Sequence, residues 1–200
     1  MKNTAVNDPN DVQVNLTLTI EETYLGTLKK IDYQRREPCG SCGEKKGQVL
    51  CFQCGGKGYV MNDLSAELDI PAGVDEGMVM SFKEKGHQVI EKGKFKGLFK
   101  PFSNTGKRTY GNLNLHLEVM AHPHFTRDGY DLIVECPLRK AELSLGINKE
   151  IQLPDKSTIR IKIPEDTQDG RTFRIMGKGF PLLNENKSGN LLIMVKISDP

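Results

Sequence analysis

The segment DVQVNLTLTIEETYLGTLKKIDY, residues 11–33, has a counterpart later in the chain, DLIVECPLRKAELSLGINKEIQL, residues 131–153. The two segments align without a gap and share eight identities in 23 positions, including Gly26 with Gly146. In the first segment, apolar and polar residues alternate on both sides of a short helical turn that ends at Gly26, a pattern typical of half-buried strands. This self-similarity indicates a tandem duplication.

Two further blocks repeat at shorter separations. Ile70-Pro71 returns as Ile163-Pro164, and Gly111-Asn112-Leu113 returns as Gly189-Asn190-Leu191, so the offset falls from 120 to 93 and then to 78. The first copy therefore carries one insertion before Ile70 and another before Gly111.

The remaining alternating segments predict short strands separated by turns. They cover residues 64–70, 78–82 and 113–119 in the first copy, and 159–163, 173–175 and 191–197 in the second. We therefore predict an all-β protein of two tandem β-sandwich-like subdomains. We assign a disordered lead-in to residues 1–10, the first subdomain to 11–128 and the second to 129–200.

The first insertion contains two Cys-x-x-Cys pairs, Cys39/Cys42 and Cys51/Cys54, within CGSCGEKKGQVLCFQCGGKG. A disulfide within one pair would close a very small ring, whereas four thiolates at this spacing suit one tetrahedral Zn2+ at roughly 2.3 Å from each sulfur. Four protein ligands leave no position for a catalytic water. We predict a single structural zinc ion holding a hairpin over residues 36–62. A thiol redox pair and unligated reactive cysteines are the alternatives.

The remaining composition favours a non-enzymatic protein of a reducing, cytoplasmic compartment. Clustered cysteines fit a reducing environment better than a secreted disulfide scaffold, and neither a signal peptide nor an apolar run long enough to span a membrane is visible. An organelle lumen stays open as an alternative. Cys136 aligns with Leu16 on the inward side of its strand, so we predict a buried apolar residue and not a fifth ligand. No catalytic triad, phosphate loop or carboxylate pair is apparent.

Together these motifs resemble the C-terminal client-binding region of DnaJ-type (J-domain, heat-shock) co-chaperones. The resemblance rests on the zinc knuckles, IPAGVDEG, HPHFTRDGYDL and IPEDTQDGRTFRIMGKG, and covers nearly the whole chain from Asp11 to Pro200. It implies binding of unfolded or partly folded clients for delivery to a DnaK-type ATPase chaperone, reached through a J-domain and through the partner's acidic tail. It implies neither a membrane nor nucleic acid as partner.

In such proteins the client enters an apolar groove on the first subdomain, beside an unpaired strand edge. Carried over by motif, the resemblance implies client-binding roles for Val12, Ile31, Tyr33 and Phe125, with Val14 and Leu68 as neighbours. The alternative for these side chains is plain core packing, which strand alternation favours for Val14 and Leu68.

The sequence departs from the family pattern in three respects. The full zinc-bearing class has four cysteine repeats and two zinc ions, whereas this chain has two pairs, and the missing centre is the one implicated in client handover. The J-domain signature His-Pro-Asp is absent, since His122-Pro123 is followed by His124. The family's dimerisation helix would follow Pro200, so we expect a homodimer for a full-length protein and a monomer for this chain.

The second insertion, residues 88–110, interleaves basic and aromatic side chains. Its members are Lys92, Lys94, Lys96, Lys100, Lys107, Arg108, Phe95, Phe99 and Phe102. Such a loop could stack on single-stranded nucleic acid, so a zinc-bearing nucleic-acid-binding module is the alternative function. The net charge of +2 argues against it. A thiol oxidoreductase is a third interpretation, and it requires an exposed cysteine of low pKa.

Overall fold

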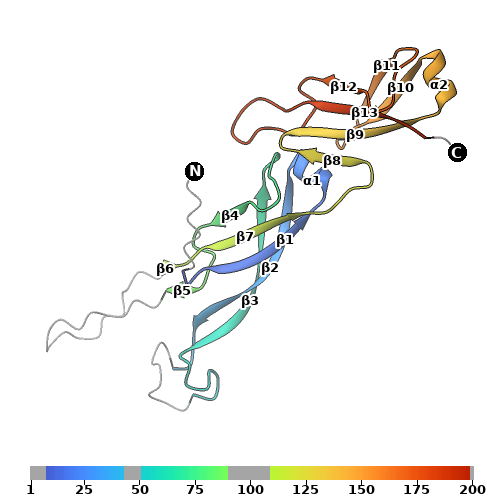
Figure 1. Ribbon diagram of the computed structural model, residues 1–200. Helices are drawn as coiled ribbons and strands as arrows, with labels where there is room; N and C mark the ends of the chain where they lie inside the picture. The colour runs from blue at the N-terminus through green and yellow to red at the C-terminus, as the bar shows by residue number, and fades with distance from the viewer. Residues whose placement is uncertain (1–7, 43–50, 90–108, 199–200) are drawn as a thin grey trace. The chain divides into compact units, whose positions relative to one another are not determined.

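The computed structural model describes residues 8–42, 51–89 and 109–198 (Figure 1). Strands dominate it, with two short helices. In chain order the elements are β1 (Val12–Leu18), α1 (Ile20–Leu25), β2 (Thr27–Pro38), β3 (Tyr59–Ile70), β4 (Val79–Phe82), β5 (Gln88–Val89), β6 (Thr109–Tyr110), β7 (Leu113–Val119), β8 (Phe125–Asp128), β9 (Asp131–Leu138), α2 (Lys140–Leu145), β10 (Ile147–Gln152), β11 (Thr158–Ile163), β12 (Thr172–Ile175) and β13 (Leu191–Ile197).

The sheets confirm the predicted all-β class of tandem units. The first copy supplies the sheets β1-β7-β4 and β2-β3, and the second supplies β12-β13-β9 together with β10-β11. Strand β8 extends the β12-β13-β9 sheet by pairing antiparallel with β9. The small β5-β6 pair closes the second insertion, whose residues 90–108, with their basic and aromatic side chains, lie outside the described residues.

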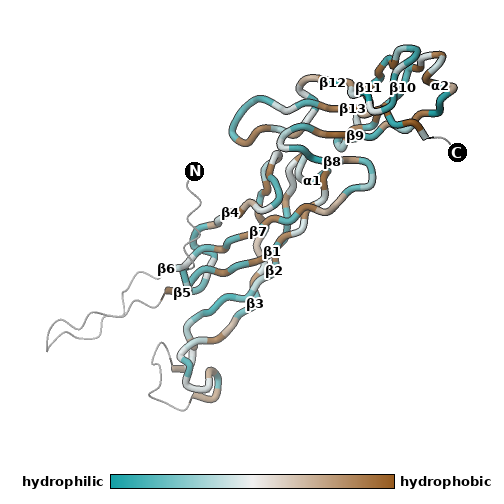
Figure 2. Tube along the Cα trace, viewed as in Figure 1, coloured by the Kyte–Doolittle hydropathy of each residue, from teal (hydrophilic) through white to brown (hydrophobic). Residues whose placement is uncertain are grey.

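Helix α1 ends at Gly26, as the sequence predicts. At the start of α1, Thr19 accepts a hydrogen bond from the Glu22 backbone N–H, and the Glu22 carboxylate accepts one from the Thr19 N–H in return. Both helices end at glycines with positive φ, 76° at Gly26 and 67° at Gly146, a backbone conformation that glycine adopts without steric cost. Along the strands hydrophobic and hydrophilic residues alternate, as the colouring of Figure 2 shows.

The same tertiary hydrogen bonds recur in both copies. The Asp11 carboxylate accepts a hydrogen bond from the Asn112 backbone N–H at 2.7 Å, and the Asp131 carboxylate accepts one from the Asn190 N–H at 2.6 Å. Asp11 matches Asp131 and Asn112 matches Asn190 in the two copies. The repeat seen in the sequence is therefore also present in the structure.

The described chain forms two compact units that interleave segments of the sequence. Unit 1 comprises the described parts of Met1–Leu16, Lys30–Glu67 and Val79–His116, and unit 2 those of Thr17–Lys29, Leu68–Met78 and Leu117–Pro200. Helix α1 belongs to unit 2 because Ile20 packs into that core and the Tyr24 ring meets the Phe180 ring edge-on at 5.5 Å. The units therefore do not coincide with the two copies, and the division at 128–129 stays a prediction about the repeats.

The core of unit 2 gathers apolar side chains from both copies. Its fully buried members include Leu132, Phe180, Ile163 and Leu191, and Cys136 lies among them with 1% of its surface exposed. The burial predicted for Cys136 is confirmed. Burial also raises the pKa of this thiol, which makes it a poor nucleophile.

We expect Gly189→Ala to destabilise unit 2 by about 3 kcal/mol, because a Cβ at this position would lie 2.0 Å from the Tyr130 carbonyl oxygen. The backbone cannot retreat easily, since the Gly189 N–H donates to the Phe180 carbonyl at 3.0 Å. Urea unfolding measures the loss. Gly40→Ala is the control, because a Cβ there meets nothing within 4 Å and its φ is not positive. Equal stabilities of the two variants would contradict the prediction.

Candidate functional site

The structure brings the four predicted cysteine ligands together at the distal ends of β2 and β3. Their sulfur atoms all lie within 4.8 Å of one another. The Cys39 and Cys51 Sγ atoms are 3.7 Å apart, and the Cys42 and Cys54 Sγ atoms are 3.5 Å apart. These separations are far longer than a disulfide bond of about 2.05 Å, so the four cysteines are not joined in disulfides.

The spacing of the sulfurs fits a tetrahedral metal site. Four ligands placed about 2.3 Å from a central zinc lie about 3.8 Å from one another, close to both measured separations. A set of four thiolates is the donor set of structural zinc and of iron–sulfur centres. Three of the four cysteines are buried and Cys42 is half-buried, so a bound ion would be shielded from water.

Backbone groups prepare the site for thiolates. The Gly58 N–H donates to the Cys54 sulfur at 3.3 Å, and the Cys39 N–H donates to the Gly58 carbonyl at 3.0 Å. Burial disfavours the Cys54 thiolate, but the N–H groups of Gly58 and Gly56 and the neighbouring thiols outweigh burial and lower its pKa to about 6. The glycines of the knuckle are thus part of the site, because they expose these N–H groups.

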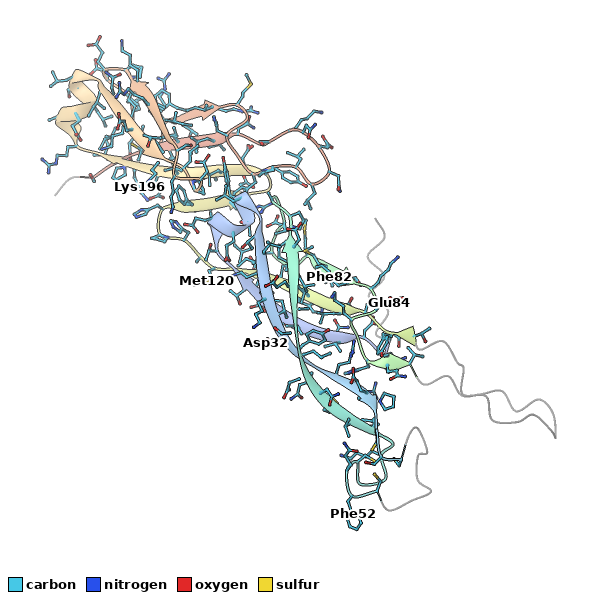
Figure 3. The ribbon with its side chains drawn as sticks, turned by 180° about the vertical axis from the view of Figure 1, so that it is seen from behind. Asp32, Phe52, Phe82, Glu84, Met120 and Lys196 are labelled. Carbon is cyan, nitrogen blue, oxygen red and sulfur yellow. The ribbon has the colours of Figure 1, made fainter. Side chains whose placement is uncertain are left out.

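One side chain of the knuckle faces water. Phe52, between two ligands, is fully exposed, and Figure 3 shows it projecting from the end of the hairpin. Residues 43–50, the tip of the predicted hairpin 36–62, lie outside the described residues.

The predicted client-binding residues fall on four strands. In unit 1, Val12 and Val14 lie on β1 and Ile31 and Tyr33 on β2; in unit 2, Leu68 lies on β3 and Phe125 on β8. Val12, Ile31, Tyr33 and Leu68 are buried, whereas Val14 and Phe125 are half-buried. Their role in client binding stays a prediction.

Phe125 is held by a histidine that sequence reasoning assigned to no role. The His122 ring stacks on the Phe125 ring with centroids 4.6 Å apart, and its Nδ1 accepts hydrogen bonds from the backbone N–H groups of His124 and Phe125, both at 3.1 Å. The other ring nitrogen lies 3.3 Å from the Glu21 carboxylate. His122 therefore fixes the turn that presents Phe125.

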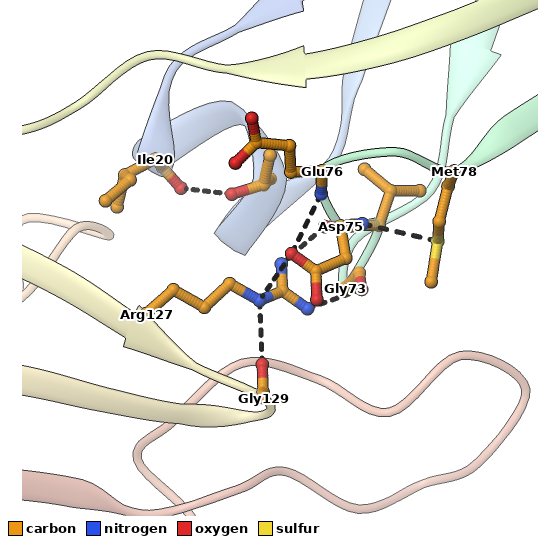
Figure 4. A network of polar contacts seen from close by, with 9 residues as sticks. Ile20, Gly73, Asp75, Glu76, Met78, Arg127 and Gly129 are labelled. Carbon is orange, nitrogen blue, oxygen red and sulfur yellow. Dashed lines mark hydrogen bonds and ion pairs between the residues drawn. The ribbon is translucent and has the colours of Figure 1, made fainter.

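Two residues further along β8, Arg127 is the centre of a buried polar network (Figure 4). Its guanidinium donates to the carbonyls of Gly73, at 3.0 Å, and Val74, and its Nε donates to the Gly129 carbonyl at 2.7 Å and lies 3.3 Å from Asp75. The same guanidinium lies 4.3 Å above the Phe180 ring. Only 8% of the side chain is exposed.

No sequence signal singled out Arg127, because all of its polar partners except Gly129 come from a segment that is distant in the chain. The IPAGVDEG motif contains Gly73, Val74 and Asp75, and HPHFTRDGYDL contains Arg127 itself. The structure shows that these two motifs form one network, so their presence together in the sequence has a structural cause.

The fold and the cysteine cluster define a class of protein: two tandem β-units with a hairpin set into the first, whose four cysteines have a geometry that suits a metal ion. Comparison with known proteins identifies the family, since the model of the DnaJ C terminal domain matches residues 12–200. The chain belongs to the DnaJ C-terminal domain family.

Individual relatives agree with this assignment. The chaperone protein DnaJ of Brucella canis is 27% identical across 95% of this chain, and that of Brucella abortus is 26% identical across the same share. The chain spans 57% of the length of these curated relatives. Among the helices of the described ranges, none is long and apolar enough to cross a membrane.

Proposed function

We propose that this chain binds exposed apolar segments of unfolded or partly folded proteins, as the client-binding part of a DnaJ-type co-chaperone that delivers them to a DnaK-type ATPase. The observation that carries the proposal is the edge of β2. In the described sheets β2 pairs with β3 alone, so its other edge is free beside the buried Ile31 and Tyr33. An extended client can add main-chain hydrogen bonds at such an edge while its side chains enter an apolar pocket.

The expected affinity suits a chaperone that must also release its client. Burial of one client Leu or Phe contributes roughly 1.5–3 kcal/mol, and ordering of the client offsets part of this gain. We therefore expect micromolar binding that tolerates many client sequences. The proposed role involves no reaction of the client and is not enzymatic. Membership of the DnaJ C-terminal domain family over residues 12–200 supports it.

We further propose that the cysteine cluster holds one structural zinc ion through Cys39, Cys42, Cys51 and Cys54. The ion would fix the ends of β2 and β3 where the chain has little apolar core of its own. Within the described residues these cysteines are the group that satisfies a metal-binding geometry. We also propose the cytoplasm as the compartment, because it keeps thiols reduced.

The test of client binding is fluorescence anisotropy of a labelled Leu/Phe-rich peptide titrated with the zinc-loaded chain at low and moderate salt. We expect saturable micromolar binding that survives the added salt, and Tyr33→Ala is expected to weaken it about tenfold by removing one apolar contact. Val14→Ala, at a half-buried position of β1, is the second variant in case Tyr33→Ala unfolds.

Tyr130→Ala is the matched control, because that tyrosine is 39% exposed and lies in a turn. Unchanged affinity in folded Tyr33→Ala and Val14→Ala proteins would contradict a client site formed by β1 and β2. Binding that disappears with salt would point to the charged second insertion instead.

A further inference from the structure

The turn at residues 122–125 of unit 2 is built around one ring nitrogen. The backbone N–H groups of His124 and Phe125 both donate to Nδ1 of His122, each at 3.1 Å. Pro123 has no N–H, so these are the first two amides after His122. A ring nitrogen accepts hydrogen bonds only while it carries no proton. The neutral His122 ring therefore carries its single proton on Nε2, which lies 3.3 Å from the Glu21 carboxylate.

The same ring also holds the Phe125 side chain. The rings of His122 and Phe125 stack with their planes 22° apart. Phe125 is the first residue of β8, where it lies opposite Val134 of β9, and it packs against the core of unit 2. The contacts of the His122 ring thus decide how β8 begins.

A second proton on the His122 ring removes the acceptor on which the turn depends. This proton can bind only at Nδ1, because Nε2 is already protonated, and an imidazolium ring has donors only. The N–H groups of His124 and Phe125 then face another N–H group, and a polar group left without its partner is costly. Histidine changes its charge between about pH 5 and 8, so mild acid is the condition that delivers this proton.

Glu21 of α1 faces the His122 ring and favours its charged form. The Glu21 side chain is 39% exposed, and an ion pair at such a position contributes little to stability. The loss of two backbone hydrogen bonds outweighs that contribution. The protonated ring therefore stays beside Glu21 while the turn loses its acceptor.

The other charges near the turn do not favour a protonated ring. The cavity that His122 lines contains two lysines and two further carboxylates, Lys149, Lys156, Glu135 and Glu150. Both carboxylates already have cationic partners, at 3.0 Å in Lys196 and at 2.6 Å in Arg160. The lysines oppose any further positive charge. The His124 ring, 5.9 Å from that of His122, also gains charge in acid and has the same effect.

We propose that His122 is a pH-sensitive switch in unit 2: the neutral ring holds the turn at residues 122–125, and the protonated ring releases the turn and frees the start of β8 with Phe125. The switch converts a fall in pH into a local change at Phe125 while the core of unit 2 stays folded. It concerns the turn itself, so it stands whether or not Phe125 contacts a client.

The test is amide hydrogen exchange of the isotope-labelled, zinc-loaded chain, followed by NMR at about pH 7.5 and about pH 5.5, on either side of the ordinary titration of histidine. Each exchange rate is divided by that of an unstructured amide at the same pH, which gives a protection factor. We expect the protection factor of the Phe125 amide to fall about tenfold at the lower pH. The Leu132 amide, which donates to the Asn190 carbonyl at 2.8 Å, is the internal control and stays protected at both. Equal protection of Phe125 at the two pH values would overturn the proposal.

Three variants separate His122 from other titrating groups. His122→Asn keeps an acceptor, because an asparagine oxygen accepts from the N–H groups that follow it in a turn, and it has no charge to gain. We expect protection of the Phe125 amide at both pH values in His122→Asn and at neither in His122→Ala. His124→Gln is the matched control, at an exposed histidine of the same turn, and is expected to keep the pH dependence of the wild type. A pH-dependent loss that persists in His122→Asn, or that disappears in His124→Gln, would overturn the assignment to His122.

Discussion

Replacing Cys54 by serine is expected to release the metal and to unfold the cysteine hairpin while the rest of the chain stays folded. Cys54 receives the Gly58 N–H on its sulfur and has its pKa lowered to about 6, so it is the ligand best prepared to bind as a thiolate. Structural zinc contributes on the order of 10 kcal/mol to ordering a small metal-bound segment. The hairpin has little apolar surface that could replace that contribution.

Two measurements check this result. Metal analysis is expected to give one zinc per wild-type chain and none for Cys54→Ser. Hydrogen exchange is expected to show lost protection at the Cys39 and Gly55 amides, which donate to the Gly58 and Cys51 carbonyls. Cys136→Ala is the control. Because Cys136 lies in the core of unit 2, the Cys136→Ala protein is expected to retain the metal. A Cys54→Ser protein that keeps stoichiometric zinc and full protection would contradict a four-cysteine site.

The second large effect is expected from Arg127→Ala, which should destabilise unit 2 by about 3–5 kcal/mol. The truncation leaves the carbonyls of Gly73, Val74 and Gly129 without the donor that they share, and it removes the cation from the Phe180 ring. Arg127→Lys keeps the positive charge, but a lysine ammonium group cannot reach all of these acceptors. We therefore expect an intermediate loss of about 2 kcal/mol in the free energy of unfolding.

Urea unfolding of the whole chain measures both variants. Arg171→Ala is the matched control, because Arg171 is exposed and likewise lies over a phenylalanine ring, 5.6 Å from that of Phe173, but anchors no loop. A loss of no more than about 0.5 kcal/mol is expected there. If Arg127→Ala were as stable as Arg171→Ala, the network of Figure 4 would have no energetic role.

Much of the fold could be predicted because its signals are local. Alternation of apolar and polar residues marked the strands, and Gly26 and Gly146 marked the ends of both helices. The spacing of the cysteines within one short insertion predicted that four sulfurs meet. The Thr19 capping box was missed, although Thr19 and Glu22 carry its sequence signature.

The division into units could not be predicted, because it depends on packing between segments distant in the chain. Ile20 follows the first strand of the first copy, yet it packs into the core of unit 2. The repeat describes how the two copies are related, whereas the compact units reflect which apolar faces were available for burial.

Local sequence is enough to predict the duplication, the strands of each copy and the meeting of the four cysteines, since each is encoded by residues that lie close together or recur at a constant offset. The Arg127 network and the division into two compact units depend on tertiary packing alone. Arg127 meets Gly73 across 54 residues of chain, and Ile20, which follows the first strand of the first copy, packs into the core of unit 2. Such sites depend on how separate segments pack, and the periodicity of one strand carries no information about the partner it will meet.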